Sequence, residues 1–242
     1  MRVFLTLAYD GSRFGGFQQQ IHDTNTVMNH LIASLKKLNI NTTPAGAGRT
    51  DKGVHALGQV VHVDLPEFWS DVHLLRTTLN QHLAPYIYIK HITPVEHTFH
   101  ARYSATARQY RYLLNHGVFS PFLSPYHLFY PTKPSLEKIN KALECFVGTH
   151  DFSLFKKTGS PTTHNVRTLF EAHAYTHKHL SVFSFKGSGF LRSQVRMMVA
   201  AALAYEKGVL SKEDLRAQID NARQVFTGLV SPNGLYLTRI YY

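Results

Sequence analysis

The stretch "AGAGRTDKGVHALGQV", residues 45–60, is the most informative part of the sequence. It combines Arg49, Asp51 and His55 with glycines at positions 46, 48, 53 and 58. Directly after it the side chains alternate, with Val61, Val63 and Leu65 on one face and Val60, His62 and Asp64 on the other. Alternation with a period of two is typical of a strand that buries one face. The loop is therefore predicted to lead straight into a half-buried strand.

The residues of this loop alone leave its role open. Glycines permit tight turns, and Arg49 and Asp51 could simply be solvated on the surface. The alternative is that the charged residues carry chemistry on a rigid support. The rest of the chain has to decide between the two interpretations.

Composition favours a globular protein that attracts polyanions. The chain has 242 residues, 44% of them hydrophobic, enough for one large domain or two small ones. Lys and Arg number 26 against 15 Asp and Glu, which gives a formal net charge of +11. Nucleic acid is the leading partner on that ground, with a basic surface that serves only solubility as the alternative.

Several classes of protein are disfavoured. The single cysteine, Cys145, lies in the apolar pattern of an expected helix and is interpreted as a small core residue, so no disulfide within the chain is expected. The 16 histidines come with no paired-cysteine motif and no HExxH, which argues against a metal site. No apolar stretch reaches the length of a membrane span, and we expect a cytoplasmic protein without membrane association.

Patterns of strands and helices recur in a similar order on either side of residue 105. We expect strands at 2–9, 86–92, 108–115 and 235–242, a hairpin that turns at 177–179, and helices at 26–39, 70–82, 135–147, 190–207 and 211–223. The opening strands of the halves, "RVFLTLAYDG" at 2–11 and "RQYRYLLNHG" at 108–117, match weakly. The order predicts two related α+β halves, 1–104 and 105–242, with a cleft between them.

Motifs spread through nearly the whole chain resemble the tRNA pseudouridine synthase A family. They are "YDGSRFGGFQ" at 9–18, "AGRTDKGVHALGQVVH" at 47–62, "FHARYSATARQYRYLL" at 99–114, "DFSLF" at 151–155, "GFLRSQVRMMV" at 189–199 and "GLYL" at 234–237. One departure is Phe17, where the family usually has Trp; Phe keeps an aromatic face, so we interpret it as a packing variation.

The resemblance implies a fold, an activity and partners. The fold is two ferredoxin-like halves joined into a long, mainly antiparallel central sheet with helices packed on it. The activity is isomerisation of uridine to pseudouridine at positions 38, 39 and 40 in the anticodon stem-loop of tRNA, by a homodimer without cofactor or metal.

Asp51 is the catalytic carboxylate that the resemblance implies. Pseudouridine formation detaches uracil from C1′ of its ribose, turns the base and rejoins it through C5. This needs a nucleophile or base and exclusion of water. The sequence leaves open whether Asp51 attacks C1′, attacks uracil C6 or removes a ribose proton.

Two residues of the second half match the family's remaining active-site positions. Arg196 would form the ion pair that a buried carboxylate needs, the alternative being a solvated helix residue. Tyr110 would stack on the target uracil with its hydroxyl available for proton transfer, and core packing is its alternative.

RNA contacts are expected from further residues. Arg49 could fill the space that a flipped base leaves, and the glycines beside it let the chain approach the RNA closely. His55 could contact RNA or fix the loop through a hydrogen bond to the backbone, and the structural role is favoured. Phosphate contacts are expected from the basic residues Arg13, Arg102, Arg108, Arg111, Lys156, Lys157, Arg167 and Arg192.

Two other functions remain in competition. A non-catalytic module that binds structured RNA would explain the charge but leave Asp51 and Arg196 without a purpose. A metal-dependent nuclease would use Asp51 with Asp64, although a two-metal site normally needs a tighter cluster of carboxylates.

Overall fold

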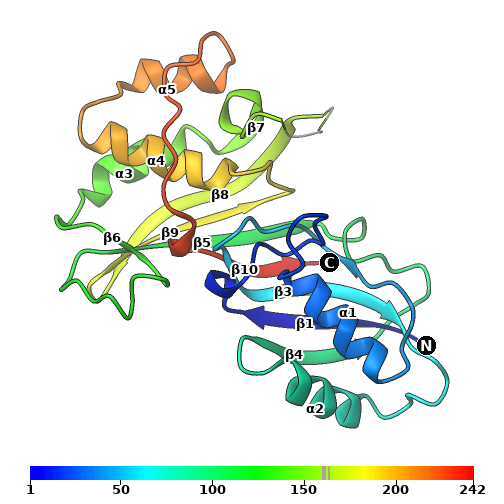
Figure 1. Cartoon of the computed structure of the whole chain (residues 1–242). Helices are drawn as coiled ribbons and strands as arrows, with labels where there is room; N and C mark the ends of the chain where they lie inside the picture. The colour runs from blue at the N-terminus through cyan, green and yellow to red at the C-terminus, as the bar shows by residue number, and fades with distance from the viewer. Residues whose placement is uncertain (160–161, 163) are drawn as a thin grey trace. The chain divides into compact units, whose positions relative to one another are not determined.

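A computed structural model describes residues 1–159, 162 and 164–242. The chain forms two compact units, drawn in Figure 1: Met1–Thr106 with Tyr236–Tyr242, and Ala107–Leu235. The division differs from the expected halves 1–104 and 105–242, because the last strand belongs to the first unit. There it pairs in parallel with a strand of that unit, Tyr236 opposite His55.

The first unit is built on a mainly antiparallel sheet. Strand β1 (Arg2–Tyr9) pairs antiparallel with both β3 (His55–Asp64) and β4 (Ile87–Pro94), and the short β2 (Ala45–Gly46) pairs with β3. The other neighbour of β3 is β10 (Leu235–Tyr241). Every second residue of β1 is buried, which fits the period-two pattern of a strand with one fully covered face.

Two helices of the first unit cover that face (Figure 1). Helix α1 (Val27–Lys37) begins at Thr26, whose side chain accepts a hydrogen bond from the Asn29 N–H. Helix α2 (Val72–Leu83) begins at Asp71, which caps two N–H groups in the same way. Both helices bury leucines, among them Leu31, Leu35, Leu75 and Leu79.

The second unit has its own sheet, in the order β5-β9-β8-β7, with all of these pairings antiparallel. The strands are β5 (Ala107–Asn115), β7 (Gly148–Asp151), β8 (Val166–His177) and β9 (Leu180–Gly187), and β6 (Leu128–Phe129) pairs with β5. The hairpin of β8 and β9 turns at Lys178, as the sequence predicted. The α+β fold class is confirmed in both units, whereas the joining of the two sheets and the cleft stay predictions.

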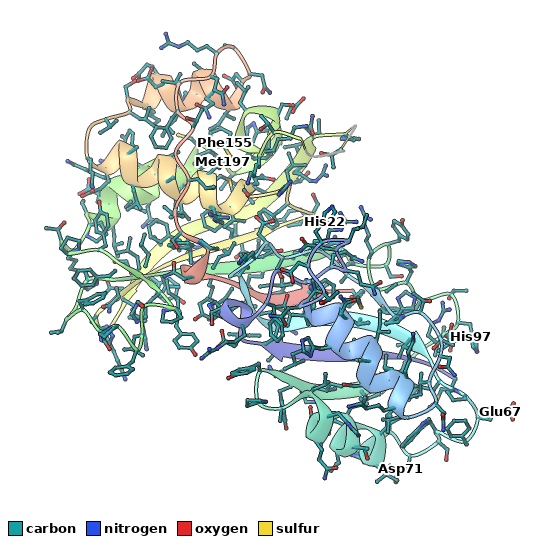
Figure 2. The ribbon with its side chains drawn as sticks, viewed as in Figure 1. His22, Glu67, Asp71, His97, Phe155 and Met197 are labelled. Atoms are coloured by element: carbon teal, nitrogen blue, oxygen red, sulfur yellow. The ribbon has the colours of Figure 1, made fainter. Side chains whose placement is uncertain are left out.

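Helices α3 (Leu136–Glu144) and α4 (Gln194–Glu206) cover one face of strands β8 and β9, and α5 (Lys212–Ile219) follows them (Figure 1). Helix α4 is buried nearly all round rather than along one stripe, and Met197 and Phe155, labelled in Figure 2, are both buried. Within the described residues, no helix is both long and apolar enough to cross a membrane.

Three details of the sequence interpretation are corrected. Strand β3 begins already at His55 and is buried on both faces over most of its length, not half-buried; Phe99 and Ala101, for example, lie against His62. Helix α4 begins only after Ser193, whose φ of 62° is left-handed, so Arg192 precedes the helix instead of lying on it. Cys145 caps the C-terminus of α3 and is half-buried, not a core residue.

Candidate active site

The loop between β2 and β3 holds Asp51 and is fixed by hydrogen bonds on both sides of Arg49. The Gln59 side chain donates from Nε2 to the carbonyl oxygen of Gly48 (3.0 Å). The carbonyl oxygen of Thr50 accepts from the N–H of Phe17 (3.2 Å). Arg49 itself is exposed and Asp51 is half-buried. A fixed main chain therefore presents both charged side chains, which favours the functional interpretation of the loop.

Two glycines of the loop have different tasks. Gly53 has φ +80°, and it lies in the turn where the Val54 N–H donates to the Asp51 carbonyl oxygen (3.1 Å). A Cβ at Gly46 would lie 2.4 Å from Cε1 of Phe17, which is 1% exposed under the loop. Gly53 is therefore required by the turn, and Gly46 by close packing against Phe17.

His55 is buried, with 2% of its surface exposed. Its Nδ1 accepts a hydrogen bond from the Gly11 N–H (3.1 Å), and its ring stacks on Tyr236 with centroids 4.6 Å apart. An Nδ1 that accepts carries no proton, so its 3.4 Å approach to Asp10 is not an ion pair. The placement suits the structural role and not a contact with RNA.

Asp64 lies at the far end of β3 from the loop of Asp51. A strand of ten residues spans about 30 Å. Asp64 forms a two-pronged pair with Arg2, at 2.7 and 2.8 Å, which holds the pKa of this carboxyl below its usual value through hydrogen bonding. The carboxylate pair that a nuclease would need is therefore not formed by Asp51 and Asp64, and among the described residues no three His, Cys, Asp or Glu side chains are grouped to hold a metal ion.

Tyr110 and Tyr112 differ in burial although both lie on β5. Tyr112 is fully buried, whereas Tyr110 is half-buried, with its ring edge-to-face against Phe190 at 5.2 Å. Tyr112 is thus the core aromatic of this strand. Tyr110 as a whole keeps part of its surface exposed, and its ring contacts Phe190, a residue to which the sequence reasoning gave no role.

Arg196 is half-buried on a helix that is otherwise almost wholly buried. Its Nε donates to the Val230 carbonyl oxygen (2.8 Å), and the Tyr112 hydroxyl donates to the next carbonyl, that of Ser231 (2.8 Å). Burial raises the pKa of Tyr112, and the charge of Arg196 opposes that shift. Tyr112 is a neighbour of Arg196 that sequence reasoning missed, since a tyrosine in an alternating strand carries no distinguishing signal.

The basic residues expected to contact phosphate divide into two groups. Arg13, Arg102, Arg111, Lys157 and Arg192 are exposed. Arg108, Lys156 and Arg167 are half-buried and donate to protein oxygens, at 2.7 Å to Ser188, 2.8 Å to Asn165 and 2.6 Å to Val166. The first group is the better placed for phosphate, because the second already holds loops of the second unit.

The structure therefore brings the candidate residues together in two sets. Arg49 and Asp51 share a loop of the first unit; Tyr110 and Arg196 belong to the second. The expected ion pair of Asp51 with Arg196 joins the two sets and stays a prediction.

Comparison with known proteins gives the family. A family model described as tRNA pseudouridine synthase matches residues 6–104 and 142–242. Proteins named tRNA pseudouridine synthase A are similar over the full length: one from Campylobacter jejuni is 39% identical over 100% of both chains, and one from Helicobacter hepaticus is 42% identical over 98% of this chain and 97% of its own.

Among solved structures, a Cbf5-Nop10-Gar1 complex aligns with 83% of this chain and 44% of its own, with a TM-score of 0.38 and 13% identity. That likeness is too weak to support any inference. The family model spans Asp51 and Arg196 but not Tyr110, whose assignment depends on the strand motif alone. On the match of its sequence over nearly its whole length, the chain belongs to the tRNA pseudouridine synthase family.

Proposed function

We propose that this protein isomerises uridine to pseudouridine at positions 38, 39 and 40 in the anticodon stem-loop of tRNA, with Asp51 as the catalytic residue. The observation that carries the proposal is the loop of Asp51: it lies within the span of the family match, and backbone and side-chain hydrogen bonds hold it on both sides of Arg49. A preorganised carboxylate is what this chemistry needs, because a nucleophile or base must assist while the C1′–N1 bond breaks, a C1′–C5 bond forms and a proton leaves C5, with no net oxidation.

The roles of the other residues follow from their placement. Exposed Arg49, two residues before Asp51, enters the space of the flipped nucleotide. Tyr110, which is half-buried, offers its ring to the uracil, and Arg196 supplies the positive charge of the proposed pair with Asp51. The proposal requires the three residues to act on one uridine.

The decisive experiment is incubation of the purified protein with an unmodified tRNA transcript in EDTA, followed by mapping of pseudouridine. Isomerised uridine in intact RNA supports the synthase, whereas cleavage that EDTA abolishes would select the nuclease and binding alone the RNA-binding module. Asp51→Asn should abolish product and keep tRNA affinity within about tenfold. Glu67→Gln is the matched control. It removes the same negative charge from an exposed side chain, labelled in Figure 2, that lies outside the loop of Asp51.

A homodimer and a cytoplasmic location complete the proposal. A tRNA is long enough to lie across two subunits while its anticodon arm enters one of them. The mass of the protein in solution, measured with and without tRNA, tests the homodimer: a monomer that retains full activity would contradict it.

A further inference from the structure

Two hydroxyl groups meet directly behind the loop of Asp51. The hydroxyl oxygens of Tyr9 and Thr50 lie 2.8 Å apart, and both side chains are nearly inaccessible, at 5% and 7%. Tyr9 ends β1, and Thr50 immediately precedes Asp51. A buried hydroxyl that lost this partner would be costly, so the pair is a fixed link between sheet and loop.

Thr50 forms a second hydrogen bond, through its main chain, with a residue that follows Tyr9 in the sequence. Phe17, whose ring stacks on Tyr9 with centroids 6.1 Å apart, donates its N–H to the Thr50 carbonyl oxygen. Gly16 has φ +129°, and a Cβ there would lie 3.2 Å from that oxygen. Thr50 is therefore held through its side chain by Tyr9, 41 positions earlier, and through its main chain by Phe17.

We infer that Tyr9 and Thr50 are positioning residues: their hydroxyl pair sets the place of Asp51 without touching the RNA. The inference rests on the proposed function of Asp51. Reacting atoms must approach to about 3–3.5 Å, and a misplacement of about 1 Å can cost about 100-fold in rate. Asp51 directly follows Thr50, so the two hydrogen bonds of Thr50 keep the carboxylate within this distance of its place. Without the hydroxyl pair, the hydrogen bond from Phe17 to the Thr50 carbonyl oxygen has to position the loop.

The test is a set of conservative variants assayed by single-turnover isomerisation of a tRNA transcript. Tyr9→Phe keeps the ring and its stacking on Phe17 but removes the hydroxyl of Tyr9. Thr50→Val keeps a side chain of similar shape but removes the hydroxyl of Thr50. We expect a rate of isomerisation about 10- to 100-fold lower in each, with tRNA affinity changed by less than about threefold. The double variant should be no slower than the slower single variant, because both substitutions remove the same hydrogen bond between Tyr9 and Thr50. Thr50→Ser, which keeps the hydroxyl, should restore most of the rate.

Tyr242→Phe is the matched control. Its hydroxyl donates to the Ala101 carbonyl oxygen at 2.9 Å, so the change also removes one tyrosine hydrogen bond from the first unit. We expect Tyr9→Phe to lower the melting temperature at least as much as Tyr242→Phe, because Tyr9 is buried and Tyr242 is exposed, but a slow reaction only from Tyr9→Phe.

The inference is overturned if Tyr9→Phe reacts within about twofold of the unmodified protein, or if Tyr242→Phe slows the reaction equally. An active Asp51→Asn protein would instead overturn the proposed role of Asp51 and this inference with it. An inactive Asp51→Asn protein together with a fully active Tyr9→Phe protein removes the positioning role alone.

Discussion

Arg196 donates a hydrogen bond from Nε to the carbonyl oxygen of Val230, 2.8 Å away. The bond joins helix α4 to the segment that precedes β10 and fixes one edge of the guanidinium. The neighbouring carbonyl of Ser231 is held by Tyr112. A planar guanidinium oriented in this way is preorganised for a carboxylate, which a flexible lysine would not be.

Arg196→Met tests the charge at this position. Methionine keeps much of the apolar stem but removes the cation that the proposed pair with Asp51 needs. We expect a large loss of turnover, with tRNA binding much less affected. Turnover across pH 6 to 9 measures this, after a melting curve has shown that the variant is folded.

The control for this variant is Arg216→Met, an exposed arginine on α5 in the same unit. It loses the same charge and should keep the turnover of the unmodified protein. A folded Arg196→Met protein with unchanged turnover throughout the pH range would make Arg196 a bystander.

A pair of substitutions at Tyr110 separates its ring from its hydroxyl. Tyr110→Phe keeps the ring and its edge-to-face contact with Phe190, so uracil stacking should persist while proton transfer is lost. We expect tRNA affinity to stay and the rate to fall about 10- to 100-fold, with one limb of the pH–rate profile removed. Tyr110→Ala should lose affinity as well, because stacking is worth about 1–3 kcal/mol per base. Equal rates for Tyr110→Phe and the unmodified protein would limit Tyr110 to stacking.

Much of the fold was readable from the sequence, and the parts that were not have identifiable causes. The hairpin turn at Lys178 follows from local polarity. The burial of both faces of β3 could not be read from its own residues, because it depends on distant segments such as the one with Phe99 and Ala101, which contacts His62. The late start of α4 depends on the left-handed backbone of Ser193, a conformation that a serine gives no sign of.

The site was predictable to a different degree in each half. Roles could be given to Asp51 and Arg49 because the motif that holds them resembles the tRNA pseudouridine synthase A family, whereas the glycines and charges of the loop alone left its role open. The Tyr9–Thr50 pair and the Tyr112 neighbour of Arg196 join residues far apart in sequence, so no spacing pattern reports them. His55 shows the converse: a polar residue in a functional motif is buried and supports the loop.

Arg49 should influence base flipping more than overall binding. The side chain is exposed on a main chain fixed on both sides, so Arg49→Gln removes the charge with little effect on folding. We expect slower isomerisation and a smaller loss of affinity, because one of several phosphate contacts is removed. A fluorescent analogue at the target uridine reports flipping directly. Lys52→Gln, an exposed cation in the same loop, is the control; an identical effect of both changes would indicate general charge rather than a specific role.

Stability should fall as the pH drops below neutrality, because three histidines favour their neutral form in the folded chain. The pKa values of His62, His116 and His127 are lowered, in each case chiefly by burial. The unfolded chain then binds protons below about pH 6.5 where the folded chain does not. Stability is therefore fully present above this pH and is lost as the pH falls toward the lower folded pKa, by at most about 1.4 kcal/mol per pH unit for each histidine.

His62 offers the sharpest test of this pH dependence. Its Nδ1 accepts the Ala101 N–H at 3.2 Å, its ring lies 4.6 Å from that of His100, and the charges of His100 and Arg2 add to the effect of burial in lowering its pKa. His62→Gln keeps an acceptor but cannot titrate, so the fall in melting temperature between pH 7.5 and 5.5 should become shallower. His22→Gln, an exposed histidine labelled in Figure 2, should leave that fall unchanged. The Asp64–Arg2 pair does not interfere, since the lowered pKa of Asp64 places its loss of stability in a more acidic range. Melting curves with the same slope for His62→Gln and the unmodified protein would show that His62 does not couple folding to pH.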